Sequence, residues 1–300
     1  MKLTLCDVAP RDGLQNEPVV LDPTVRAELC TRLAAAGAAS IEAVSFVRED
    51  RVPTMARAEE VIAAAGSLPL SGLVLNERGY RRARAAGLRE VHYAFPVTES
   101  FARRNQGTTV EAGVRTAGRL GELAHADGIR YTVTLAVAFG CPFEGPVPER
   151  TVVALAERVA AARPDAIVLA DSIGVAVPRQ VRMLVGELQA LTDVVGGHFH
   201  NTRNTGYANA LAAVEAGARW IDAATGGLGG CPFAPGATGN IAMEDLVYLL
   251  DGMGVDTGME LEALRDTSAW LARQVEHELP SLVAQAGGFP LMSGKYEAMH

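Results

Sequence analysis

The sequence predicts a (β/α)8 barrel of the α/β class, a TIM barrel, with a helical C-terminal extension. Short β-branched runs alternate with Ala-rich amphipathic stretches along the 300 residues, a pattern typical of parallel strands joined by helices. Glycines stand just past several of the helical stretches, where helices commonly end. No GxGxxG motif follows the first strand, which argues against the rival fold, a doubly wound open sheet.

The predicted elements follow one another without a linker. Eight strands are predicted at residues 3–6, 40–44, 71–75, 90–95, 130–136, 166–169, 194–200 and 220–224. Helices with apolar residues at helical spacing are predicted between them, at residues 22–36, 56–65, 77–86, 110–126, 149–162, 178–191 and 206–216. Two more helices, at residues 243–250 and 261–279, form the extension from about residue 243. We therefore expect a single domain spanning residues 1–300.

Composition narrows the class of protein. The net charge is −8 and no basic run occurs, which argues against nucleic-acid binding. No stretch of 18 uncharged apolar residues is present, so we expect no membrane span. The chain enters an apolar strand almost at its first residue, which leaves no room for a signal peptide. The four cysteines lack CxxC spacing, which favours reduced thiols and a cytoplasmic protein.

Lysine is scarce. Of the 27 basic residues, only Lys2 and Lys295 are lysines, and both lie close to a chain end. A Schiff-base mechanism needs a lysine held inside a pocket, and neither is well placed for that. Carbonyl chemistry in this protein would therefore rely on a metal ion.

The pattern His198-Phe199-His200 is the strongest sign of such an ion. On a strand, both imidazoles of His-x-His point to the same side. Asp12 and Asn240, far away in sequence, are further candidate ligands. Imidazole, carboxylate and amide oxygen make a mixed N/O site suited to a divalent cation. We expect Mg²⁺ or Mn²⁺, with Zn²⁺ or Co²⁺ as alternatives.

The positions of these residues on the predicted barrel support one common site. Asp12 follows the first strand, Asp171 ends the sixth, the two histidines end the seventh, and Asn240 closes a Gly-rich loop after the eighth. Glu42 lies in the second strand. The C-terminal ends of barrel strands meet at one face, where the active sites of this fold lie.

These motifs resemble the 3-hydroxy-3-methylglutaryl-CoA lyases, within the DRE-TIM metallolyase group. The resemblance covers roughly residues 3–275, and its first and last motifs are specific. The matching segments are APRDGLQNE at 9–17, IE at 41–42 with SFV at 45–47, GCPFEG at 140–145, DSIG at 171–174, HFH at 198–200, GGLGGCPFAPGATGN at 226–240 and EDLVY at 244–248.

The resemblance implies a role for each site residue. It makes Asp12, His198, His200 and Asn240 the metal ligands. It makes Arg11 the group that stabilises an enolate and Cys231 the loop thiol that transfers a proton. Polar residues that support the site are implied at three further positions, Gln15, Glu42 and Asp171. It also implies an acyl-CoA substrate and a homodimer. The remaining histidines, His92 among them, are expected to be structural or solvated.

The reaction implied is cleavage of a 3-hydroxyacyl-CoA between C2 and C3 to an acyl-CoA, such as acetyl-CoA, and a keto acid. A metal bound to the hydroxyl would lower its pKa. The Arg11 guanidinium could donate hydrogen bonds to the thioester oxygen as negative charge grows there.

This chain departs from the family pattern where the acyl group is recognised. Thr132 and Thr134 stand where the family carries Arg and Tyr, and Asn201 replaces the usual Asp after His-x-His. Val168 replaces a Ser, and Pro18 stands where Lys is common. Fewer cationic groups should weaken recognition of a distal carboxylate. We therefore hypothesise a related 3-hydroxyacyl-CoA that is bulkier or less polar than the methylglutaryl compound.

Three alternatives stay open from the sequence. A Claisen-type synthase would run the condensation instead, although such relatives usually carry an extra regulatory domain. A metal-dependent aldolase would act on free keto acids, without CoA and without need of Cys231. A catalytically silent barrel used for binding or assembly would hold no divalent ion.

Overall fold

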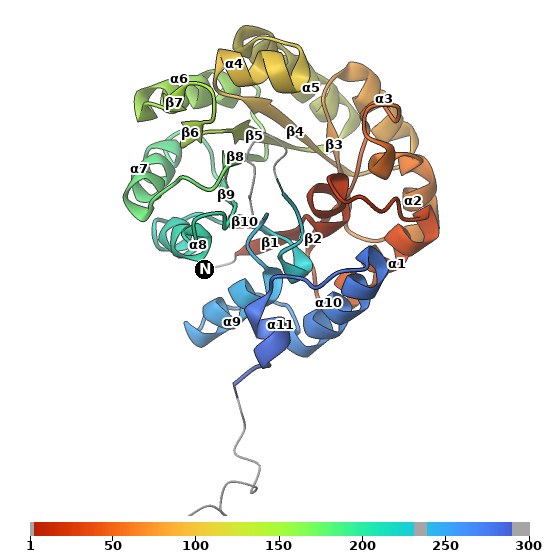
Figure 1. The fold of residues 1–300 in the computed structure, drawn as a ribbon. Coiled ribbons are helices and arrows are strands. Elements are labelled where there is room, and N and C mark those ends of the chain that lie inside the picture. The colour runs from red at the N-terminus through yellow and green to blue at the C-terminus, as the bar shows by residue number, and fades with distance from the viewer. Residues whose placement is uncertain (1–2, 231–238, 290–300) are drawn as a thin grey trace, which may run out of the picture.

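The computed structural model describes residues 3–230 and 239–289 and shows a closed parallel barrel surrounded by helices (Figure 1). The strand order around the barrel is β1-β10-β9-β8-β5-β4-β3-β2. The last barrel strand thus lies beside the first, which closes the sheet. This confirms the predicted (β/α)8 fold.

The barrel strands match the predicted strands to within two residues at each end. They are β1 (Thr4–Asp7), β2 (Ser40–Ser45), β3 (Leu70–Val74), β4 (Glu90–Pro96), β5 (Arg130–Ala136), β8 (Ala166–Asp171), β9 (Val195–Phe199) and β10 (Trp220–Ala223). A small antiparallel pair that the sequence analysis did not predict follows β5. It consists of β6 (Gly140–Cys141) and β7 (Gly145–Pro146).

The predicted helices are all present. They are α1 (Pro23–Ala35), α2 (Ala58–Ala65), α3 (Glu77–Ala85), α5 (Val110–Asp127), α6 (Glu149–Ala160), α7 (Pro178–Leu188), α8 (Gly206–Glu215), α9 (Met243–Gly252) and α10 (Leu261–Val275). The prediction that the last of these runs to residue 279 is wrong. The helix ends at Val275 because Glu276 adopts a left-handed conformation, with φ 61°, which stops a right-handed helix.

Several short elements escaped the sequence analysis. They are the turns Ala9–Gly13, Pro53–Met55, Ala102–Gln106 and Thr225–Gly227 and the short helices α4 (Glu99–Phe101) and α11 (Leu282–Ala286). Each is five residues or fewer, too short for a hydrophobic period to be recognised. The turn Ala9–Gly13 matters most, because it carries Arg11 and Asp12.

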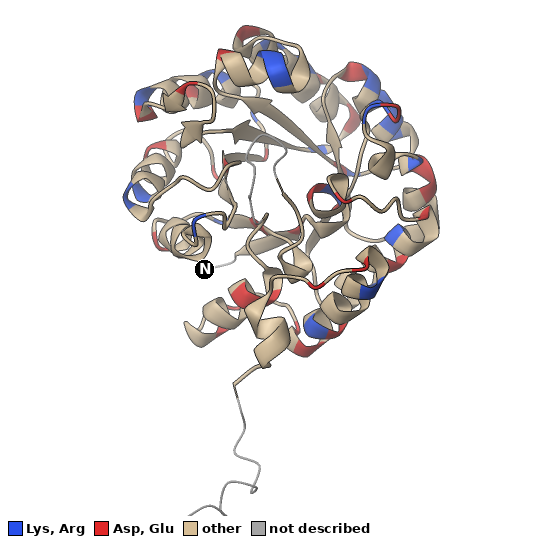
Figure 2. Ribbon diagram, viewed as in Figure 1, with Lys and Arg blue, Asp and Glu red and all other residues tan. Residues whose placement is uncertain are grey.

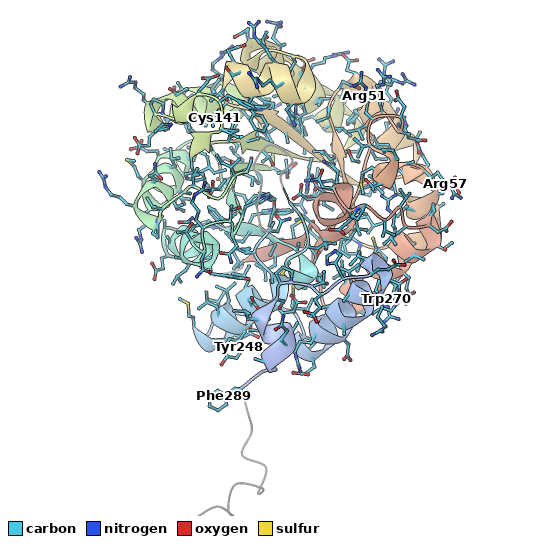
Figure 3. All side chains as sticks on the ribbon, in the orientation of Figure 1. Arg51, Arg57, Cys141, Tyr248, Trp270 and Phe289 are labelled. Atoms are coloured by element: carbon cyan, nitrogen blue, oxygen red, sulfur yellow. The ribbon has the colours of Figure 1, made fainter. Side chains whose placement is uncertain are left out.

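The outer helices carry most of the charge. Figure 2 shows basic and acidic residues interspersed around the ring of helices. Side chains fill the space inside the ring of strands (Figure 3). The extension packs onto the first helix, where the Arg32 guanidinium lies 4.8 Å from the centroid of the Trp270 ring. None of the described helices is long and apolar enough to cross a membrane.

Two buried carboxylates tie the segment after β1 to the segment after β10. Asp7 accepts a hydrogen bond of 2.6 Å from the Thr225 hydroxyl and one of 2.9 Å from the Ala9 amide. Glu244 accepts from the Gly226 amide at 3.0 Å. Burial raises the pKa of Asp7 to about 6 and the pKa of Glu244 to about 8.

We expect Glu244 to make the stability of the protein depend on pH. Its pKa rises from 4.5 to about 8 on folding, so the folded state holds the proton more tightly between these values. This group therefore lowers the free energy of unfolding as pH rises through that window, by at most about 1.4 kcal/mol per pH unit. In Glu244→Gln this contribution is absent, so its unfolding free energy should fall less between pH 5 and pH 8. Urea unfolding at both pH values measures the difference. An equal fall in the unfolding free energy of variant and wild type between the two pH values would contradict this prediction.

Candidate metal centre

The four predicted metal ligands meet at the C-terminal face of the barrel. His198 lies in β9 and His200 directly follows it, while Asp12 comes from the turn after β1. Nε2 of His200 lies 3.8 Å, and Nε2 of His198 4.0 Å, from Oδ2 of Asp12. One ligand atom from each of these three residues lies within 4.8 Å of the ligand atoms of the other two. Asn240 joins them, with Nδ2 2.9 Å from the same Asp12 oxygen.

The donor set fits a divalent cation. Ligand atoms around an octahedral ion with bonds of about 2.1 Å lie roughly 3 to 4.2 Å apart, which is close to the spacing seen here. Asn240 Nδ2 also donates to the Leu228 carbonyl at 3.1 Å. Asn240 Oδ1 is left buried without a hydrogen-bond partner among the described residues. A buried orphan acceptor is costly, and a metal ion would satisfy it.

A glycine permits this approach of the late loop to the early turn. Gly229 has φ +132°, and a Cβ on it would lie 2.7 Å from Nδ2 of Asn240. Any larger residue would be strained at this φ and would push Asn240 away from Asp12. The close approach of Asn240 explains why a glycine is needed at position 229 of the Gly-rich segment.

Asp222 is a further residue of the candidate site, which the sequence analysis missed. Its Oδ2 lies 3.2 Å from Nδ1 of His198, and its Oδ1 accepts a hydrogen bond of 2.7 Å from Nε1 of Trp220. When the neutral His198 ring carries its proton on Nδ1 and donates to this carboxylate, Nε2 is unprotonated and can bind a metal. Asp222 pairs in register with His198 across β10 and β9. An acidic residue inside an apolar strand was a signal that Asp222 is unusual, but the sequence alone does not show that His198 is its partner.

Arg11 lies between two carboxylates beside the metal site. Nη1 donates to Asp12 Oδ1 at 2.6 Å, and Nε donates to Glu42 Oε2. Burial alone would lower the pKa of Arg11, but the charges of Glu42 and Asp12 outweigh it and raise that pKa. Nη2 makes no hydrogen bond within residues 3–230 and 239–289. The guanidinium therefore stays charged and has one N–H₂ group left for a substrate.

The other predicted site residues lie differently. Gln15 lines the cavity next to the metal ligands. Asp171 does not line it, and both its oxygens accept backbone hydrogen bonds of 2.9 Å, from Val175 and Ala176. Asp171 thus shapes the loop after β8, and its catalytic role stays a prediction. Cys231 lies outside the described residues, and its role stays a prediction too.

The cavity has a volume of about 270 Å³ and opens beside the ligands. Among the described residues that line it, Arg11 is the single Lys or Arg. On β5, Thr134 lines the cavity, whereas Thr132 is buried deeper in the barrel. The part of β5 that lines the cavity therefore offers a hydroxyl and no positive charge.

Comparison with known proteins gives one family. The family model described as HMGL-like matches residues 2–271. An (R)-citramalyl-CoA lyase of Chloroflexus aurantiacus is 46% identical, over 95% of each chain. The mitochondrial hydroxymethylglutaryl-CoA lyase of Mus musculus is 34% identical over 95% of this chain and 89% of its own.

The fold agrees with that family. A solved structure of an HMG-CoA lyase from Acinetobacter baumannii, in complex with coenzyme A and 3-methylmalate, superposes with a TM-score of 0.91 at 37% identity. The alignment covers 97% of this chain and 98% of that one.

We expect Asp222→Asn to weaken metal binding about 10- to 100-fold, the usual cost of changing an outer-shell partner. A carboxylate can accept from both Trp220 and His198, whereas an amide can accept through one oxygen only. Its NH₂ group would favour the His198 tautomer that cannot bind metal. Titration calorimetry with Mn²⁺ measures the affinity.

Trp220→Phe is the matched control, because it removes one donor to Asp222 and keeps the carboxylate. It should bind Mn²⁺ nearly as tightly as wild type. Unchanged affinity in Asp222→Asn, or an equal loss in both variants, would contradict the assigned role of Asp222.

Proposed function

Because this chain belongs to the HMGL-like family and is a carbon–carbon lyase, we propose that its preferred substrate is a 3-hydroxyacyl-CoA with a carboxylate directly on C3. Citramalyl-CoA is such a compound, and its cleavage between C2 and C3 yields acetyl-CoA and pyruvate. The observation that carries this choice is that Arg11, which we assign to the enolate, is the single Lys or Arg among the described residues that line the cavity.

The residues of the site have different roles in the proposed cleavage. Asp12, His198, His200 and Asn240 would hold a divalent cation. When bound, that cation would supply Lewis-acid chemistry, which lowers the pKa of the substrate hydroxyl and stabilises the negative charge beside it. As the C2–C3 bond breaks, its electron pair moves into the thioester and forms an enolate. Arg11 donates to that enolate oxygen. The hydroxyl proton leaves to water as C3 becomes a ketone, Cys231 donates a proton to C2, and the resulting thiolate regains a proton from water.

The relatives' names suggest two substrates, citramalyl-CoA and hydroxymethylglutaryl-CoA. The number of positive charges in the cavity favours the first. In hydroxymethylglutaryl-CoA the carboxylate lies one methylene farther from C3 than in citramalyl-CoA. A carboxylate at that distance calls for a cation of its own. Arg11 is already shared between Glu42 and Asp12, and residues 231–238 contain no Lys or Arg.

The comparisons also bear on the size of the acyl group. The relative with 46% identity is named for citramalyl-CoA, whose acyl group is one carbon shorter than the methylglutaryl group. The ligand named in the solved relative, 3-methylmalate, is likewise an α-hydroxy acid. We therefore keep the expectation of weak recognition of a distal carboxylate and replace the hypothesis of a bulkier substrate by that of a smaller one.

The named relatives are lyases, which favours cleavage over the condensing synthase and the aldolase. We further propose Mg²⁺ or Mn²⁺ as the metal, because carboxylate and amide oxygens suit these ions. A single domain over residues 1–300 and a homodimer are proposed from the family resemblance. Tyr248 on α9 (labelled in Figure 3) and Met253, which directly follows that helix, expose apolar surface that a dimer could cover. A cytoplasmic location is supported by the free thiols of Cys6, Cys30 and Cys141.

A panel of CoA thioesters tests the proposed substrate. With Mg²⁺ or Mn²⁺ present, kcat/KM for (R)-citramalyl-CoA should exceed that for hydroxymethylglutaryl-CoA. One extra methylene in a pocket typically changes this ratio by about 10- to 200-fold. Pyruvate and acetoacetate are measured separately, because both substrates release acetyl-CoA. Equal or better turnover of the methylglutaryl compound would refute the substrate assignment while leaving the lyase intact.

Two variants serve as controls in the same assay. Asp12→Ala should lose both the metal and nearly all turnover. Cys231→Ala should keep the metal and turn over poorly, because it loses the proton donor alone. A Cys231→Ala variant with full activity would remove the thiol from the mechanism.

A further inference from the structure

His92, expected from the sequence to be structural or solvated, is buried at the centre of a chain of charged side chains. In β4 its Nδ1 lies 2.9 Å from Oε1 of Glu42, and its Nε2 lies 3.1 Å from Oε1 of Glu90. Glu90 in turn lies 3.4 Å from the Arg130 guanidinium. Glu42 also accepts from Arg11. The chain therefore runs from Arg11 at the mouth of the barrel to Arg130 at the start of β5.

His92 is held in a fixed orientation and carries a proton. Burial alone would lower the pKa of His92, but its hydrogen bonds to Glu42 and Glu90 outweigh burial and raise that pKa to about 10. Its ring meets Trp220 edge-to-face, with ring centroids 5.7 Å apart. Gly196 makes room for Trp220, because a Cβ on it would lie 3.1 Å from that ring. Both ring nitrogens of His92 thus donate, each to one carboxylate.

The contact with Glu42 limits how Glu42 can bind Arg11. A carboxylate and a guanidinium commonly form two parallel hydrogen bonds. Here His92 takes one oxygen of Glu42, so Glu42 holds Arg11 through Nε alone. Without a donor on Oε1, both oxygens of Glu42 could take hydrogen bonds from Arg11. The guanidinium would then turn toward β2, away from the position that leaves Nη2 for substrate.

We propose that His92 is a positioning residue for the lyase reaction, which by occupying Oε1 of Glu42 keeps the Nη2 group of Arg11 available to the enolate oxygen. This inference rests on the proposed lyase function and adds a residue to it. His92 is not one of the metal ligands and does not itself line the cavity, whereas its partner Glu42 does. It acts through Glu42.

Two conservative variants separate this role from a structural one. An Asn side chain places its NH₂ group near the position of Nδ1, and a Gln side chain places it near the position of Nε2. His92→Asn therefore keeps the donor to Glu42, whereas His92→Gln keeps the donor to Glu90. Both lose the positive charge. We expect His92→Gln to lower kcat about 10- to 100-fold with KM little changed, as for a misplaced catalytic group. His92→Asn should recover most of that loss.

A Glu90 variant and the activity of the wild type complete the test of the role proposed for His92. Glu90→Gln should keep kcat near that of wild type, because it changes only the partner of Nε2. Equal kcat in His92→Asn and His92→Gln would overturn the inference, as would a loss in Glu90→Gln as large as in His92→Gln. Wild type without cleavage of any thioester in the panel would instead refute the proposed function. If neither His92 variant folds, a crystal structure of wild type decides. Contact between His92 and Glu42 supports the inference, and a Glu42 bound to Arg11 through both oxygens overturns it.

Discussion

The pairing of β1 with β10 is the interaction on which the site depends. Thr4 to Asp7 of β1 pair in register with Trp220 to Ala223 of β10, and this pairing closes the barrel. It brings Asp12 within hydrogen-bonding distance of Asn240, 228 residues away in the sequence. The buried Asp7 reinforces the closure through Thr225. A slip of this register by one residue would turn alternate side chains to the other face of the sheet and would separate the ligands.

Charge balance is the second constraint, because a barrel interior is a costly place for an ionised group. The buried carboxylates of the site do not stand alone. Glu42 lies between Arg11 and His92, and Asp222 between His198 and Trp220. Glu42 contacts Arg11, for which we propose a role at the substrate, and Asp222 contacts His198, for which we propose a role at the metal. The same contacts that make these charges tolerable therefore fix the geometry of the reacting groups.

Much of this could be predicted from sequence because it depends on local periodicity. Strands and helices follow from apolar spacing, and strand ends at one face of a barrel place Asp12 near His198 and His200. The roles of Asp222 and His92 could not be predicted, because they depend on which residues lie side by side across strands. Register sets the pair of Asp222 with His198, and barrel curvature sets the contact of His92 with Glu42. Neither leaves a pattern along the chain.

Asp12, His198, His200 and Asn240, which are distant in sequence but meet at one face of the barrel, are expected to hold one cation. Crystals soaked in Mn²⁺ test it most directly, through the anomalous scattering of that ion. The account predicts a single strong peak bonded to Asp12, to Nε2 of His198 and His200, and to Oδ1 of Asn240, with bonds of about 2.1 to 2.3 Å. A peak elsewhere, or one that lacks either imidazole, would contradict it.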